Sequence, residues 1–273
     1  MKRQLPSILL HALLIVIALL TLAPLAWMVS ASLMPAGAAN STPPPLLPSR
    51  VTFEHYVALF TRLDLGRNFM NSTIITVSTT LFALMVNAMA GYAFAKLRFR
   101  NRDRLFTWLI AALAIPAQVA MLPLFLLLKS LGLVNTYVGA MIPLMATIYG
   151  IFLVRQFMVS IPDDVIAAAR IDGASEWRIY RSIILPLARP VLATLAIFTF
   201  MSAWNDFMWP LIILSDQRKY TLPVAIANLL GEHVQDLELM MAGSVITVIP
   251  VLALFFALQK QYIAGMMAGS VKE

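Results

Sequence analysis

The chain has 273 residues, of which 60% are hydrophobic and only 12% are charged, and its mean hydropathy is +0.83. A water-soluble domain of this length cannot bury so much apolar surface, so the composition indicates a membrane protein. The absence of cysteine excludes a disulfide framework and a thiolate metal site. The net charge of +7 is spread in short clusters between long apolar runs. This pattern is typical of membrane-protein loops and argues against a nucleic-acid-binding face.

Six stretches of the chain are long and apolar enough to be membrane-spanning helices. Crossing about 30 Å of hydrocarbon takes about 20 helical residues, and each stretch reaches that length. They cover residues 8–30, 69–95, 105–128, 133–154, 190–214 and 239–259. The sequence therefore predicts an all-α, polytopic membrane protein with a single transmembrane domain over residues 1–273.

The first stretch is also a candidate signal peptide, because Lys2 and Arg3 precede it. The apolar region of a signal peptide has about 7–15 residues, and the stretch here is longer. We therefore expect a retained membrane anchor. Four prolines within residues 41–49 then predict a stiff, extended spacer, since proline lacks the N–H donor that a helix needs. A short element is expected after it, near residues 53–60.

Lysine and arginine are divided unevenly between the predicted loops. If the N-terminus lies in the cytoplasm, most of the 20 basic residues fall on the cytoplasmic side. Because cytoplasmic loops are rich in lysine and arginine, the sequence predicts a multi-pass protein of a bacterial-type plasma membrane, with both termini in the cytoplasm. The cluster over residues 96–104 is the strongest single signal. We interpret it as a topology signal in preference to a lipid-binding patch.

The chain carries no motif of an enzyme. It has no G-x-x-x-x-G-K-[ST] sequence, so it has no P-loop of its own that can hold nucleotide phosphates. His11, His55 and His233 lie on different segments and lack the spacing of metal ligands. We therefore expect a non-enzymatic chain that binds no metal or cofactor.

The loop between the fourth and fifth predicted spans, residues 160–186, has the signals of two short helices. Ser160 and Asp163 have the spacing of a capping box at the start of the first helix. Gly173 supplies a position that tolerates positive φ and can end this helix. Ser175 can then cap the second helix. The sequence therefore predicts a helix–turn–helix.

Two interpretations of this loop stand side by side on physical grounds. Ala167, Ala168 and Ala169 give the first helix a narrow surface that another protein can approach closely, which favours a rigid docking element. The alternative is an amphipathic helix on the lipid headgroups, anchored by Trp177 and Tyr180. The residues alone do not separate the two.

Residues 168–186 resemble the EAA loop of ABC importer permeases, whose pattern is E-A-A, then D-G-A, then an apolar run that ends in L-P. Asp172, Gly173 and Ala174 form the D-G-A triplet, and Leu185-Pro186 ends the run at the right spacing. In that family, the loop forms coupling helices that sit in a cleft of a cytoplasmic ATPase subunit. The resemblance implies that the docking residues are Ala167, Ala168, Ala169, Arg170, Asp172, Gly173 and Ala174.

One position departs from the family pattern. Ala167 stands where the family has a glutamate, which is thought to meet a basic group on the ATPase. The departure affects that one contact and leaves the expected fold and docking site in place.

The likeness to carbohydrate-uptake permeases of the maltose-transporter type runs from about Phe69 to the C-terminus. It is carried by residues 115–123, 131–137, 204–210 and 261–272. It implies import of a sugar or oligosaccharide and a heterodimer with a second permease. It also implies an extracytoplasmic solute-binding protein and two copies of a cytoplasmic ABC ATPase, which bind the ATP and Mg.

Asp206 is the only acidic residue inside a predicted span. At 1.5 Å per residue it lies about 24 Å along the helix from Pro190, in the outer part of the hydrocarbon core. One interpretation places its carboxylate at the outer headgroups, flanked by interfacial Trp204 and Trp209. The other places Asn205 and Asp206 on the translocation path, where sugar hydroxyls need hydrogen-bonding partners.

Asn87 and Gln118 are weaker candidates for the path, because buried amides also hold membrane helices together. Two other classes of protein remain as alternatives to the permease. An ion-coupled secondary carrier usually has ionisable residues near the middle of the membrane, whereas this sequence has one off-centre acid. A membrane scaffold that docks cytoplasmic partners without transport is the third class.

Overall fold

The computed structural model describes residues 4–61, 63–232 and 236–270, without the side chains of 4–8, 229–232 and 258–270. Every regular element in these ranges is a helix. This confirms the all-α, polytopic class. Five residues that count in the arguments on basic charge and on histidine lie outside the residues that the structure describes: Lys2, Arg3, Arg62, His233 and Lys272. The side chains of the tail motif, residues 261–272, lie outside them too.

Within the described residues, three single helices are long and apolar enough to cross a membrane. They are α1 (Gln4–Ser32), α3 (Leu65–Lys96) and α14 (Leu237–Ser270). They lie over the first, second and sixth predicted stretches. Three bent pairs of helices pass the same test when each pair is taken together, so the described chain has up to six spans.

The other predicted spans are broken where continuous helices were expected. The first bent pair is α4 (Arg102–Ala111), continued by η1 (Ala112–Ala114), with α5 (Ala117–Ser130), and the bend is 104°. The second is α6 (Tyr137–Met145) with α7 (Ile148–Val159), bent by 43°. The third is the run of α9 (Glu176–Ile179), η2 (Tyr180–Ile184) and α10 (Leu185–Leu187) with α11 (Arg189–Trp204), bent by 77°. The predicted stretch 190–214 is α11 followed by a separate short helix, α12 (Met208–Ile213).

Proline and threonine explain two of these breaks. Pro116 lies at the sharpest bend, and Ile115 before it is extended, with φ −87° and ψ 119°. Proline disfavours the helical conformation in the residue that precedes it. The shallower bend lies at Ala146 and Thr147, both extended, and the Thr147 hydroxyl accepts a hydrogen bond from Gly150 N at 3.1 Å. The hydrophobic pattern predicts the whole apolar stretch, and these local proline and threonine signals determine where it divides into two helices.

Two compact units make up the chain, and each combines segments that are far apart in the sequence. Unit 1 comprises Met1–Gly66 and Leu222–Pro250, and unit 2 comprises Arg67–Thr221 and Val251–Glu273. Two further helices belong to unit 1: α2 (Glu54–Thr61) and α13 (Leu222–Glu232).

In unit 1, the proline-rich segment 41–49 contains no helix, as predicted, but it bends at several residues where an extended spacer was expected. It follows the end of α1, where two side chains bind its carbonyl groups. Trp27 Nε1 donates to Pro45 O at 3.0 Å, and Ser30 Oγ donates to Leu46 O at 2.6 Å. The spacer is thus attached to the helix that precedes it.

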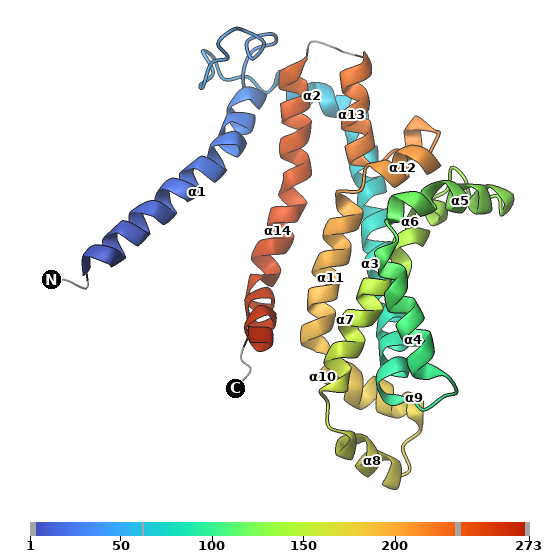
Figure 1. Ribbon diagram of the computed structural model, residues 1–273. Coiled ribbons are helices and arrows are strands. Elements are labelled where there is room, and N and C mark those ends of the chain that lie inside the picture. The colour runs from blue at the N-terminus through green and yellow to red at the C-terminus, as the bar shows by residue number, and fades with distance from the viewer. Residues whose placement is uncertain (1–3, 62, 233–235, 271–273) are drawn as a thin grey trace. The chain divides into compact units, whose positions relative to one another are not determined.

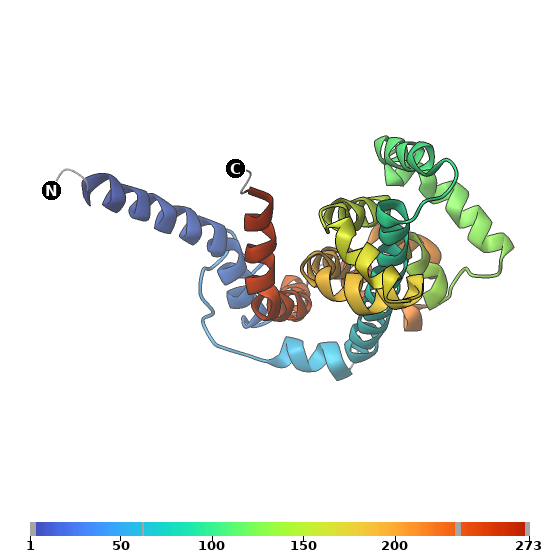
Figure 2. The same cartoon turned by 90° about the horizontal axis from the view of Figure 1, so that it is seen from below.

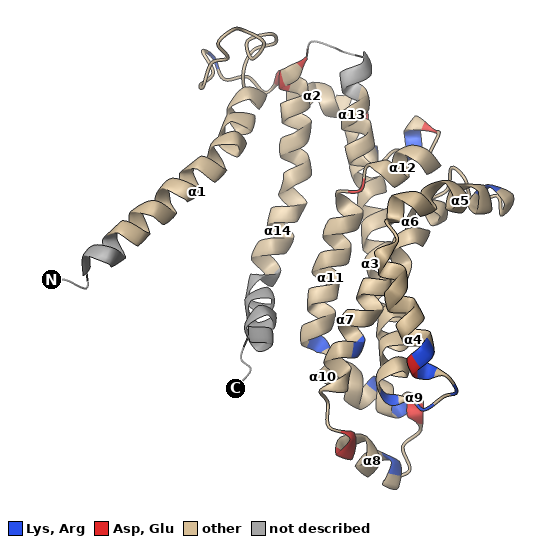
Figure 3. Cartoon of the chain, viewed as in Figure 1, with Lys and Arg blue, Asp and Glu red and all other residues tan. Residues whose placement is uncertain are grey.

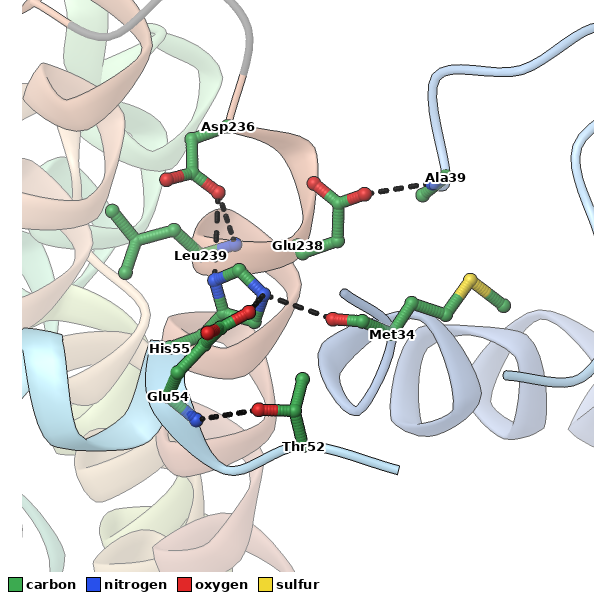
Figure 4. Close-up of polar contacts among 8 residues, drawn as sticks. All are labelled: Met34, Ala39, Thr52, Glu54, His55, Asp236, Glu238 and Leu239. Carbon is green, nitrogen blue, oxygen red and sulfur yellow. Dashed lines mark hydrogen bonds and ion pairs between the residues drawn. The ribbon is translucent and has the colours of Figure 1, made fainter. Parts of the chain in front are cut away.

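A buried polar cluster joins the segment after α1 to α2 and to the start of α14 within unit 1 (Figure 4). His55 is 3% exposed, and its Nε2 lies 2.9 Å from Met34 O. Because a carbonyl can only accept, Nε2 donates there, and Nδ1 lies 3.6 Å from Asp236 Oδ1. Glu238 is fully buried and accepts a hydrogen bond from Ala39 N at 2.7 Å through Oε1. We call Met34, Ala39, His55, Asp236 and Glu238 the unit 1 polar cluster.

In unit 2, helices α3, α7 and α11 lie side by side (Figures 1 and 2). Their shared core contains Ala88, Tyr92, Val154, Met158, Val191 and Leu195. At one end of these helices lie α8 (Asp163–Ile171) and α9 (Figure 1). At the other end a second core joins α5, α6 and α12, and the short helix η3 (Gln217–Lys219) follows α12.

Candidate functional site

A tight turn joins α8 to α9 at one end of unit 2. Gly173 has φ 77°, which confirms the positive-φ position predicted from the sequence. Gly173 N donates to Arg170 O at 3.1 Å, and Ala174 N donates to Ala169 O at 3.0 Å. These two bonds form a Schellman motif, which ends a helix through a left-handed residue. Ser175 caps α9 as predicted, accepting a hydrogen bond from Arg178 N at 3.3 Å.

The start of α8 differs from the prediction, because Ser160 does not cap it. Ser160 ends α7 with a helical backbone, and its Oγ donates to Phe157 O at 2.7 Å. An N-cap residue takes an extended conformation, and here Pro162 has it, with φ −59° and ψ 135° and no side-chain cap. The capping box of Ser160 and Asp163 was therefore wrong.

The inner face of this helix pair is packed into the core of unit 2. Ile166 is 2% exposed, and Ala169 and Ile179 are also buried. They share a hydrophobic cluster with Tyr92 of α3 and Met158 of α7. The turn is therefore attached to two membrane-spanning helices through apolar contacts, as a rigid docking element requires. We call residues 163–179 the coupling element.

Lys96, the last residue of α3, holds the start of α8. Its side chain is only 4% exposed, and Nζ lies 2.6 Å from both Ile161 O and Asp163 Oδ1. The hydrogen bond from Lys96 and its charge lower the pKa of the Asp163 carboxyl. Sequence reasoning took Lys96 as part of the topology signal and missed this role. The only local signal is its position in the last turn of α3.

A second polar contact closes the turn itself. Arg170 Nε donates to Glu176 Oε1 at 2.7 Å, and Tyr92 OH donates to Glu176 Oε2 at 2.9 Å. The hydrogen bond from Arg170 is the main cause that lowers the pKa of Glu176, and it raises that of Arg170. The two short helices are therefore tied to each other and to α3. Charged residues gather at this end of unit 2 (Figure 3).

The outer face of the coupling element remains exposed. Ala167, Ala168, Asp172 and Gly173 are exposed on it. The large apolar side chain of Ile171 is 86% exposed there, whereas Trp177 of α9, at 60%, is exposed on the side that faces α3. These exposed residues therefore lie on a turn whose other face is fixed in the core of unit 2.

The alternative of a headgroup anchor rested on two aromatic residues, and the structure separates them. Tyr180 is 5% exposed and packs against Tyr92, with ring centroids 5.2 Å apart. It therefore cannot reach lipid headgroups. Trp177 lines an apolar cavity of about 260 Å³ with Tyr92 and other residues of α3 and with Leu97, which follows α3. Only one of the two proposed anchors is exposed.

The candidate path residues lie at the break between α11 and α12. Asn205 is exposed, and its Nδ2 donates to Met201 O at 2.8 Å. Asp206 Oδ1 accepts a hydrogen bond from Trp209 N at 3.3 Å at the start of α12. Trp204 and Trp209 are 1% and 3% exposed. They are core residues of unit 2, so they do not flank Asp206 as interfacial aromatics.

Asn87 and Gln118 are not brought together with these residues. Asn87 is fully buried and bridges α3 to the break before α7: its Nδ2 donates to Ala83 O at 2.7 Å, and its Oδ1 accepts from Thr147 N at 3.1 Å. This geometry favours the helix-joining alternative for Asn87. Gln118 is exposed near the start of α5.

Sequence reasoning also missed a polar cluster at the opposite end of unit 2. Asn71 Nδ2 donates to Arg218 O at 2.9 Å and Tyr220 O at 3.0 Å, and its Oδ1 accepts from Tyr137 OH at 2.6 Å. Asn135 Oδ1 accepts from Ser215 N at 3.2 Å. These bonds fix the segment after α12 against α3. The only signal in the sequence was the presence of asparagines next to apolar runs.

No group of three or more His, Asp or Glu side chains in the described ranges is arranged to hold a metal ion. The polar groups of the coupling element mostly bind one another, as the contacts of Lys96, Asp163, Arg170 and Glu176 show. These contacts fix the two short helices to each other and to α3.

Comparison with known proteins gives one family. The model of the binding-protein-dependent transport system inner membrane component family matches residues 87–267. The chain is 37% identical to the arabinooligosaccharides transport system permease protein AraQ of Halalkalibacterium halodurans, over 82% of this chain and 81% of that one. It is 32% identical to the lactose transport system permease protein LacG of Rhizobium radiobacter, over 100% and 98%. A chain of a bacterial ABC transporter involved in the import of the acidic polysaccharide alginate has a TM-score of 0.82 and 26% identity, over 95% of this chain and 97% of that one.

Proposed function

The chain belongs to the family of binding-protein-dependent transport system inner membrane components, and on that basis we propose that it is the permease of an importer for a sugar or oligosaccharide. It is a non-enzymatic, multi-pass subunit of the inner membrane. The main support for a sugar is the full-length similarity to a lactose permease protein, together with the arabinooligosaccharide relative.

The proposed assembly has three kinds of partner. A second permease completes the transmembrane pathway, two copies of an ABC ATPase bind ATP and Mg, and a solute-binding protein delivers the sugar. The family's dependence on a binding protein supports the last of these. The exposed apolar face of the coupling element, with Ile171 at its tip, supports a docked ATPase.

The docking surface predicted from the sequence comprises Ala167, Ala168, Ala169, Arg170, Asp172, Gly173 and Ala174, but Ala169 packs into the core of unit 2 and supports the other six from behind. Most of them are exposed on a turn that is fixed from behind by Lys96 and Glu176. Motion of a docked ATPase would therefore reach α3 and α7 directly. The coupling element then lies in the cytoplasm, and so do both termini.

We place the translocation path next to Asn205 and Asp206, at the break between α11 and α12. The exposed Asn205 offers both a donor and an acceptor to sugar hydroxyls. Asp206 lies within the same short break. Asn87, which is buried between helices, is the weaker candidate, as is Gln118.

Uptake by vesicles tests the proposed function. Vesicles that hold the chain, its ATPase and its binding protein should accumulate a sugar from a panel only when ATP is supplied inside. A proton gradient alone should drive no uptake, whereas it would drive a secondary carrier. A scaffold would bind the ATPase and transport no sugar. The chain purified free of other subunits should hydrolyse no ATP.

Single cysteines test the orientation, because the natural chain has none. A membrane-impermeant thiol reagent should label Ser41→Cys and Gln217→Cys in intact cells. It should not label Asn101→Cys or Ser175→Cys until the membrane is opened. The reverse pattern would place the coupling element outside the cell and end the docking proposal.

A further inference from the structure

A cavity of about 610 Å³ lies in the connection between α3 and α4, which follows Lys96. Its walls are Arg98, Phe99, Asn101, Arg102, Asp103 and Arg104. The basic residues were interpreted above as a topology signal in preference to a lipid-binding patch. That explains their sign but not their arrangement around one cavity.

The charges of this cavity do not balance. Asp103 is its only acidic residue and pairs with Arg102, whose Nε lies 3.0 Å from Oδ1. Arg102 also donates to Leu97 O at 3.3 Å, which fixes its side chain. Arg98 and Arg104 are exposed, and neither has an ion-pair partner within the ranges that the structure describes. Arg98 does act from a distance on Asp163, whose pKa it helps to lower.

Two guanidinium groups on one cavity without a counter-charge favour an anion with several oxygens. Guanidinium groups bind phosphate through paired hydrogen bonds. The start of α4 adds positive partial charge from the backbone amides of its first turn. Asn101, with φ 63°, precedes that turn, and its side chain makes no capping bond to these amides. The amides at a helix N-terminus attract negative charge.

The surface beyond the cavity is apolar. Trp108 is 75% exposed and Leu105 is 51% exposed. Trp108 lies four residues after Arg104, so both project from the same face of α4. Phe99, 41% exposed, lines the cavity itself. A ligand that fits has an anionic head and apolar chains.

We propose that this cavity binds the phosphate group of an anionic phospholipid. The cavity follows the last residue of α3, a membrane-spanning helix, so it lies at the depth of the lipid headgroups. The acyl chains run along Leu105 and Trp108. The site shares no residue with the coupling element, and the proposal does not depend on what the protein transports.

Native mass spectrometry of the full chain tests this site. The protein is purified in mild detergent and titrated with phosphatidylglycerol or, separately, with phosphatidylcholine. The test variant is Arg98→Gln with Arg104→Gln, and the control is Arg50→Gln with Arg218→Gln, which removes the same charge from exposed positions. The wild type and the control should retain phosphatidylglycerol in preference to phosphatidylcholine. The test variant should lose roughly tenfold or more in phosphatidylglycerol affinity, because each basic residue contributes about a factor of five.

Three results would overturn the proposal. Equal phosphatidylglycerol binding by the test variant and the wild type would show that the cavity is not used. An equal loss in the control would show that the attraction depends only on net charge. Displacement of the lipid by millimolar inorganic phosphate, with no effect of the acyl chains, would assign the cavity to a soluble anion. Matching circular dichroism spectra show that the test variant is folded, and Trp108→Ala, which keeps both arginines, should also weaken lipid binding.

Discussion

The coupling element of unit 2 and the polar cluster of unit 1 each join segments that are far apart in the sequence. They differ in whether the joining side chains are exposed or buried. The coupling element uses accessible ion pairs: the side chains of Arg170 and Glu176 are each 48% exposed, and that of Asp163 is 85% exposed. The unit 1 polar cluster uses buried groups, with Glu238 fully buried and His55 3% exposed.

The difference separates positioning from stability. Exposed ion pairs contribute little to stability because water screens them. A buried polar group that loses its partner is costly, since nothing replaces the lost hydrogen bond. Changes in the unit 1 polar cluster should therefore alter folding, whereas changes in the coupling element should alter transport by a protein that remains folded.

The largest effect on stability is expected from Glu238→Ala. It removes the acceptor of Ala39 N and leaves space in a fully buried site. The free energy of unfolding should fall by about 1–3 kcal/mol, the usual cost of an unsatisfied buried group. Thermal unfolding of the purified chain measures it. Glu238→Gln keeps an oxygen acceptor and should cost less. Equal stability of Glu238→Ala and the wild type would remove the contrast between the two regions.

The largest effect on transport is expected from Gly173→Val. Apart from Gly173 and its two chain neighbours, no described residue has an atom within 4 Å of the place of a new Cβ, so the expected effect comes from φ 77°. The strain of a β-branched residue there is about 1–3 kcal/mol, which should change the angle between α8 and α9 and lower both ATPase association and uptake sharply.

Gly37→Val is the matched control for Gly173→Val. Gly37 has φ 80° and equally open surroundings, but it lies in unit 1. Its backbone strain is therefore similar, and it leaves the coupling element intact. Normal uptake and ATPase association in Gly173→Val would show that this helix pair is an ordinary surface feature. The headgroup-anchor alternative would then be favoured.

Local signals were predictable from the sequence, and long-range contacts were not. Gly173 and Ser175 act within one turn, so their residue types predicted their roles. The prediction that Ser160 caps α8 was wrong, because Ser160 ends α7 and has a helical backbone there. Lys96 and Asp163 are 67 residues apart, and no pattern in one sequence relates them. Pro116 marks the bend between α4 and α5, but the apolar stretch around it predicted one continuous helix.

Acid should loosen the coupling element. The pKa of Asp163 and that of Glu176 are both lower in the folded protein than in the free residues. Their contribution is therefore complete above the ordinary pKa of about 4 and is lost as the pH falls through the lowered values. The protection of the amides of residues 163–179 against hydrogen exchange, relative to the intrinsic rate at each pH, should fall below about pH 4. Glu176→Gln should remove part of this loss, and protection that is independent of pH in the wild type would contradict the role of both carboxylates.

The smallest effect is expected from Ala167→Glu, which restores the residue that the family has at this position. Ala167 is exposed on α8, so the new carboxylate has room and should not disturb the fold. If the partner ATPase retains a basic group opposite this position, docking should strengthen by about 0.2–1 kcal/mol, the value of an exposed ion pair. If the partner has lost that group, the variant should be neutral or slightly weaker, and the interface has compensated on the ATPase side. Titration of the ATPase onto the wild type and the variant, each at low and high salt, separates the two cases, because a gain from an exposed pair must shrink as salt rises. A gain that is independent of salt would mean that residue 167 is buried in the interface. The docked surface would then extend from Ile171, at the end of α8, back to the middle of that helix.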